Sequence, residues 1–137
     1  MKETTLFSYT YPLRILILEE MPQAHSVMRN NLAILGYRPE IAATSQEMLT
    51  LAGKRSYDVI LTDVGSVELV NVLVTRQHEE ERRRPLVIAL TDPIRPDFWD
   101  SCLESGMDHY ISKTADPREL RLQLKACSVL SGTNRFR

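Results

Sequence analysis

YDVILTDVG, residues 57–65, is the stretch that decides the fold of this chain. Its centre, Val59 to Leu61, is continuously apolar, which is typical of a strand covered on both faces in a parallel sheet. The apolar run ends abruptly at Asp63. Because ligands of open α/β sheets bind in the crevice outside the carboxyl ends of the strands, we interpret Asp63 as a candidate site residue.

Three other predicted strands also end in polar residues. They are residues 15–18 before Glu19 and Glu20, residues 86–90 before Thr91 and Asp92, and residues 109–112 before Lys113. A weaker strand is predicted over residues 37–42, where Pro39 favours a position at the edge of the sheet.

Helical patterns separate these strands. Met21 and Pro22 predict the start of a first helix that Gly36 ends, and His25 is best interpreted as an exposed residue of it, with an approach to the site as the alternative. Further helices are predicted after a capping box at residues 44–47, and over residues 66–84, the later half of 93–105, and 117–130. Alternating strands and helices predict a parallel sheet with helices on both faces.

The last predicted helix carries two apolar stripes on different sides. The first stripe is Leu120, Leu124 and Cys127, and the second is Leu122, Ala126 and Val129. We interpret the second stripe as a further contact with the core, with a partner-binding surface as the alternative.

Composition excludes several classes of protein. The 137 residues fit one domain with a sizeable core. A balance of 17 basic and 18 acidic residues predicts no nucleic acid contact and no membrane contact by this domain, and no apolar run approaches the roughly 20 residues of a membrane helix. Cys102 and Cys127, far apart and without a CxxC motif, indicate packing thiols in a cytoplasmic setting.

Four sequence blocks follow one another in order. They are ILILEEMP (15–22), YDVILTD (57–63), PLVIALT (85–91) and GMDHYISK (106–113). With these blocks, residues 14–130 resemble a response-regulator receiver domain of two-component signalling, most similar to the receiver of a hybrid sensor histidine kinase. The resemblance implies a flavodoxin-like receiver fold, an α/β architecture with a doubly wound five-stranded parallel sheet in the order 2-1-3-4-5. Residues 1–13 would then be a leader or linker and residues 131–137 a tail.

The resemblance also implies roles for the strand ends. Asp63 would be the phosphoacceptor, taking a phosphoryl group from a phosphohistidine of a histidine kinase or phosphotransfer domain. Thr91 and Lys113 would bind that group, and Tyr110 would be the switch aromatic, although plain strand packing explains Tyr110 almost equally well. A downstream protein, or a second copy in a homodimer, would bind the face of the fourth strand and the last helix. The parent chain could be a membrane-bound hybrid kinase, a transferase whose cytoplasmic part includes this domain.

Clustered carboxylates predict a cation at the same place. Three carboxylates within a few ångströms repel one another unless a cation offsets their charge, and Mg²⁺ prefers carboxylate and carbonyl oxygens beside a phosphate. The resemblance implies that the ligands are Glu20, Asp63 and the backbone carbonyl of Gly65, with Glu19 acting through water.

Four positions depart from the receiver pattern. Glu19 and Glu20 replace an aspartate pair, which extends each carboxylate by about 1 Å at a site with roughly 0.5 Å of tolerance. Residues 65–70 replace the usual segment after the acceptor, Asp92 replaces a small residue, and Thr114 replaces a proline. These departures predict weakened Mg²⁺ binding and a loop of different shape beside the site.

The departures motivate a second hypothesis, in which a degenerate receiver acts as a phosphorylation-independent protein-interaction module. A third hypothesis is a flavodoxin-like enzyme or flavin binder. The sequence disfavours it, because no glycine-rich phosphate loop follows residues 15–18.

Overall fold

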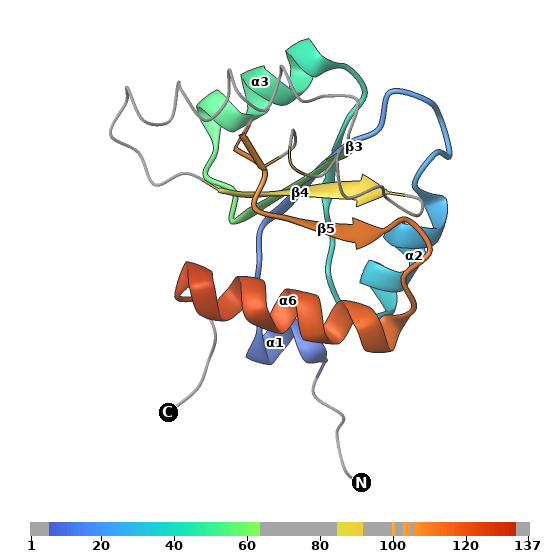
Figure 1. Ribbon diagram of the computed structural model, residues 1–137, viewed down its shortest axis with the longest axis vertical. Helices are drawn as coiled ribbons and strands as arrows, with labels where there is room; N and C mark the ends of the chain where they lie inside the picture. The colour runs from blue at the N-terminus through green and yellow to red at the C-terminus, as the bar shows by residue number, and fades with distance from the viewer. Residues whose placement is uncertain (1–5, 64–84, 92–99, 101–102, 105, 134–137) are drawn as a thin grey trace, which may run out of the picture.

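The computed structural model describes residues 6–63, 85–91, 100, 103–104 and 106–133. The helix predicted over residues 66–84 lies outside this range, as do Gly65, Asp92 and Cys102. In the described part of the chain, helices cover a central sheet from above and below (Figure 1). No helix in this part of the chain is long and apolar enough to cross a membrane.

Five parallel strands form the sheet in the order β2-β1-β3-β4-β5, which confirms the prediction. Their bounds are Ile15–Leu18 (β1), Glu40–Ala42 (β2), Val59–Asp63 (β3), Leu86–Thr91 (β4) and His109–Ser112 (β5). The apolar run around Ile60 therefore forms the central strand. The short strand β2, which follows Pro39, lies at an edge of the sheet, as predicted.

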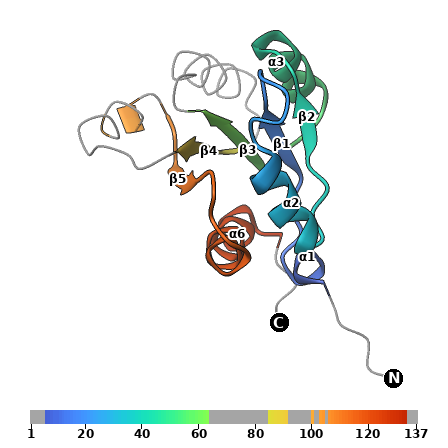
Figure 2. The same ribbon diagram turned by 90° about the vertical axis from the view of Figure 1, so that its right-hand side faces the viewer.

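Two apolar clusters fill the space between the sheet and its helices. Ile15 and Ile17 of β1 pack with helices α2 (Ser26–Ile34) and α6 (Pro117–Ser131) on one face of the sheet. Leu16 and Leu18 pack with helix α3 (Ser45–Lys54) on the other face. Figure 2 shows α2 beside α6, on the side of the sheet away from α3. Burial on both faces explains why β1 is apolar at every position.

Helices α3 and α6 begin at the capping residues that the sequence predicts. Thr44 Oγ1 accepts a hydrogen bond from the amide of Glu47 at 3.0 Å. The carboxylate of Glu47 accepts in return from the amide of Ala43 at 3.2 Å. The Asp116 side chain accepts from two amides in the first turn of α6. Side-chain caps of this kind stabilise a helix by about 1 kcal/mol each.

Helix α2 begins later than the sequence predicts. Met21 to Ala24 form turns, Gln23 has a φ of 70°, and the helix starts only at Ser26. A residue in the left-handed region cannot continue a right-handed helix, so Pro22 lies in a turn and not in a helical first turn. His25 becomes the N-cap and is 2% exposed, so the prediction of an exposed histidine was wrong.

A short helix, α1 (Phe7–Thr10), precedes the sheet and packs against the end of α2. The Ser8 amide donates to the carbonyl of Leu35 at 3.0 Å. Gly36 has a φ of +99°, and a Cβ added there would lie 2.3 Å from Ser8 Oγ. Helix α1 thus packs closely on a glycine. With only four residues it has too few positions to show a helical period in the sequence.

The two stripes of α6 have different surroundings. Leu120, Leu124 and Cys127 are buried as predicted, and burial raises the pKa of the Cys127 thiol to about 11, so this thiol is protonated at neutral pH. The second stripe is exposed, with Leu122 72% and Val129 50% exposed, so its interpretation as a core contact was wrong. Leu122 borders an open cavity of about 490 Å³ between α6 and the strands β4 and β5.

Candidate functional site

The parallel sheet brings the carboxyl ends of neighbouring strands to one edge. Strands β1 and β3 pair with Ile17 opposite Leu61, so two residues further along Glu19 is level with Asp63. Glu19 also continues the ladder to β2, because its amide donates to the carbonyl of Ala42 at 2.8 Å. The acids predicted at the ends of β1 and β3 therefore occupy neighbouring backbone positions.

Strands β4 and β5 bring the backbones of Thr91 and Lys113 to the same edge. Asp63 pairs with Leu90, so Thr91, the last residue of β4, lies one residue beyond. Thr91 is 5% exposed. The amide of Lys113, directly after β5, donates to the Thr91 carbonyl at 2.7 Å. The backbone thus holds positions 91 and 113 together, beside position 63.

The other predicted site residues are less completely described. Glu20 follows Glu19 in a bend and is exposed. Tyr110 lies in the edge strand β5 and is 39% exposed, with its ring 5.4 Å from that of His109. Gly65 and the side chain of Asp63 lie outside the described part of the chain.

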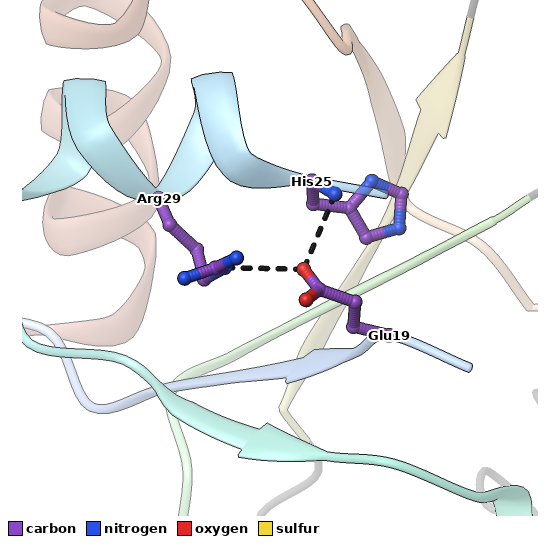
Figure 3. Close-up of polar contacts among 3 residues, drawn as sticks. All are labelled: Glu19, His25 and Arg29. Carbon is purple, nitrogen blue, oxygen red and sulfur yellow. Dashed lines mark hydrogen bonds and ion pairs between the residues drawn. The ribbon is translucent and has the colours of Figure 1, made fainter. Parts of the chain in front are cut away.

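The carboxylate of Glu19 points toward helix α2 (Figure 3). Its Oε2 accepts a hydrogen bond from the backbone amide of His25 at 3.2 Å and another from Nε of Arg29 at 3.1 Å. The Glu19 side chain is 7% exposed and that of Arg29 33%. The sequence did not single out Arg29, because an arginine within a helix is most often a solvated surface residue.

The loop that carries Lys113 is held by residues that the sequence also did not single out. The Ser112 carbonyl accepts from the amide of Ala115 at 3.0 Å, and the Ser112 hydroxyl accepts from the amide of Thr114 at 3.3 Å. Asn31 of α2 donates its side-chain amide to the Ala115 carbonyl at 2.9 Å. These contacts fix the loop at Thr114, where the resemblance implied a proline.

The donor set at this edge fits a hard divalent cation in part. Glu20, and Asp63 at the strand end, offer the carboxylate oxygens that Mg²⁺ prefers. Glu19 fits less well, because its Oε2 is already shared by an amide and a guanidinium group. Among the described side chains, which do not include that of Asp63, no three His, Cys, Asp or Glu residues gather closely enough to hold a metal ion.

The family described as response regulator receiver domain matches residues 15–125, from the start of β1 into α6. The chain is a response-regulator receiver domain. The family and the flavodoxin-like sheet order predicted from the four sequence blocks are therefore confirmed.

This receiver domain is similar to short parts of long histidine kinases. It is 32% identical over 126 residues to Histidine protein kinase 1 of Candida albicans, a match that covers 83% of this chain and 5% of that protein. It is 29% identical over 117 residues to Hybrid signal transduction histidine kinase G of Dictyostelium discoideum, a match that covers 82% of this chain and 3% of that protein. The receiver domain thus spans a small fraction of these relatives, and its predicted similarity to hybrid kinases is confirmed.

Solved structures share its fold. One is the signal receiver domain of a signal transduction histidine kinase from Syntrophus aciditrophicus, with a TM-score of 0.69 and 26% identity, covering 91% of this receiver domain and 95% of that chain. Another is a co-crystal structure of the Saccharomyces cerevisiae histidine phosphotransfer signalling protein Ypd1 and the receiver domain of its downstream response regulator Ssk1. It matches with a TM-score of 0.76 and 15% identity, covering 86% of this receiver domain and 90% of that chain.

Proposed function

We propose that this receiver domain accepts a phosphoryl group on Asp63 from a phosphohistidine and signals the change to a partner. The observation that carries the proposal is the strand register, which sets Glu19 level with Asp63 and joins the backbones of Thr91 and Lys113 beside them. An acid, a hydroxyl and an ammonium group at one edge are the groups that a phosphoryl acceptor site requires.

In the proposed reaction a carboxylate oxygen of Asp63 attacks the phosphorus atom. The new P–O bond forms as the P–N bond to the donor histidine breaks, and the bonding electron pair leaves with the imidazole, which takes up a proton. The Lys113 ammonium group offsets charge on the phosphoryl oxygens, and the Thr91 hydroxyl donates a hydrogen bond to one of them. The fastening of the Lys113 loop to β4 and to α2 supports this role, because it holds the Lys113 backbone beside Thr91.

We propose Mg²⁺ as the cofactor, held by Glu20, Asp63 and the backbone carbonyl of Gly65. When bound, the cation would offset negative charge on the carboxylates and on the incoming phosphoryl oxygens. Because Glu20 is exposed and one methylene longer than an aspartate, holding its carboxylate in one geometry costs additional side-chain entropy. We therefore propose that the affinity for Mg²⁺ is weak.

The proposed phosphoryl donor is a histidine kinase or a phosphotransfer domain. The kinases to which the chain is similar, and the Ypd1 and Ssk1 complex, support a donor of this class. We further propose that a downstream protein or a second copy binds the β4 and α6 face, where Leu122 and Leu130 are 72% and 73% exposed beside the open cavity. The proposed setting is the cytoplasmic part of a longer kinase.

Beryllofluoride, a phosphoryl mimic, is expected to shift the amide resonances of Thr91 and Lys113 in the presence of Mg²⁺. The mimic should bind at Asp63. Thr91 ends β4, which pairs with β3, and the Lys113 amide donates to the Thr91 carbonyl. Two-dimensional NMR measures the shifts, with the amides of Thr50 and Lys54 in α3 as internal references and Asp63→Ala as the control variant. An unchanged spectrum at saturating mimic would count against the proposed site.

The contacts of Glu19 favour a second function, an interaction module that works without phosphorylation. A carboxylate committed to Arg29 contributes less to a cation site, which phosphorylation needs. In this alternative, Asp63→Ala leaves partner binding and cellular output intact. Loss of output in that variant would refute the alternative and support the phosphoacceptor.

A further inference from the structure

Glu19 is a buried acid whose observed partners belong to a helix. Its side chain is 7% exposed, and its Oε2 accepts hydrogen bonds from the His25 amide and from Arg29 Nε. A buried carboxylate is costly unless hydrogen bonds and an opposite charge compensate it. Both kinds of compensation come from α2 and the turn before it, as Figure 3 shows.

The two donors, the His25 amide and Arg29 Nε, lie at the start of α2. His25 is the N-cap of α2, and the positive end of a helix dipole favours a carboxylate there. Arg29 lies one turn further along, and its amide donates to the His25 carbonyl at 2.9 Å. Glu19, directly after β1, therefore joins the end of the strand to the first turn of the helix.

We infer that Glu19 is a positioning residue that fastens α2 to the end of β1. We also infer that Arg29 keeps the Glu19 carboxylate away from the proposed cation. This inference rests on the proposed function, because it concerns the site around Asp63. A glutamate reaches about one methylene further than an aspartate, which brings Oε2 within hydrogen-bonding distance of Arg29. The proposed cation is then left to the carboxylates of Glu20 and Asp63.

A first experiment measures Mg²⁺ affinity by isothermal titration calorimetry. Arg29→Gln removes a positive charge near the site and releases the Glu19 carboxylate, so the affinity is expected to rise about fivefold. Arg29→Lys keeps the positive charge, so its Mg²⁺ affinity should stay close to that of the unaltered protein. The matched control is Arg55→Gln, since Arg55 also pairs with an acid, Glu40, but at the amino end of β2.

A second experiment measures the pair without any metal. Urea unfolding of Glu19→Gln, Arg29→Gln and the double variant forms a double-mutant cycle. A coupling of about tenfold in the unfolding equilibrium constant is expected for a charged hydrogen bond with one buried partner. A cycle without coupling would overturn the role of Glu19 as the anchor of α2.

The outcomes separate this inference from the proposed function. If the unaltered protein binds Mg²⁺ and Arg29→Gln binds it equally or more weakly, the inference is wrong and the phosphoacceptor proposal stands. If no variant takes up Mg²⁺ at millimolar concentration, the proposed cofactor falls, and the double-mutant cycle alone decides the role of Glu19.

Discussion

Replacing Asp63 with asparagine is expected to abolish the uptake of a phosphoryl group from acetyl phosphate, with a fall in rate of about 10²-fold or more. The amide of asparagine has nearly the shape of the carboxylate but carries no negative charge and is a poor nucleophile. Asp63 ends the central strand, so the fold should tolerate this change. Intact-protein mass spectrometry after incubation with Mg²⁺ and acetyl phosphate measures the uptake.

A matched control distinguishes loss of the acceptor from a general effect of removing one acid. Asp100 is exposed, so Asp100→Asn should leave the uptake unchanged. Uptake by Asp63→Asn at the rate of the unaltered protein would show that another residue is the acceptor. Equal loss in both variants would point to a change in overall charge.

Replacing Gly36 with alanine is expected to destabilise the domain by about 2–4 kcal/mol. The φ of +99° is unfavourable for a residue with a side chain, and the new Cβ would overlap Ser8 Oγ at 2.3 Å. Relief of this overlap would displace α1 from the end of α2 and break the hydrogen bond from Ser8 to Leu35. Urea unfolding followed by circular dichroism measures the change in the free energy of unfolding.

Two further variants separate the causes of this loss. In Ser8→Ala with Gly36→Ala, the overlap with the hydroxyl is absent, so part of the lost stability should return. The remainder reflects the positive φ and the tight contacts with Leu6, two of whose atoms lie 3.0 Å from the added Cβ. Gly53, inside α3, has open space around it, so Gly53→Ala should stabilise the domain by about 0.5–1 kcal/mol. A Gly36→Ala variant as stable as the unaltered protein would contradict both the positive φ at position 36 and the close packing of α1 there.

The sequence predicts those parts of the fold that depend on local pattern. The unbroken apolar run at residues 59–61 predicts a strand covered on both faces, and Thr44 and Asp116 predict the starts of α3 and α6 by their capping chemistry. The predicted start of α2 was wrong, because a proline such as Pro22 fits a turn as well as the first turn of a helix. The positive φ of Gln23 prevents the helix from starting at Pro22, and the sequence contains no local signal for that φ.

The candidate site was predictable to the level of strand ends and no further. Asp63, Thr91 and Lys113 follow apolar runs, so the parallel sheet brings their backbones to one edge. The contact between Glu19 and Arg29 depends on how α2 lies over β1, which no spacing in the sequence encodes. The same holds for Asn31, which fastens the lysine loop from a helix 84 residues earlier in the chain.

Chemical mapping of the phosphorylated residue tests the central claim most directly. The receiver domain is mixed with Mg²⁺ and a phosphotransfer domain that carries phosphohistidine, and borohydride then reduces any aspartyl phosphate to homoserine, which mass spectrometry locates in peptides. We predict homoserine at position 63 alone. Transfer to a different residue, or a phosphohistidine that stays intact in the presence of a folded, Mg²⁺-loaded domain, would contradict the assignment of Asp63 as the acceptor.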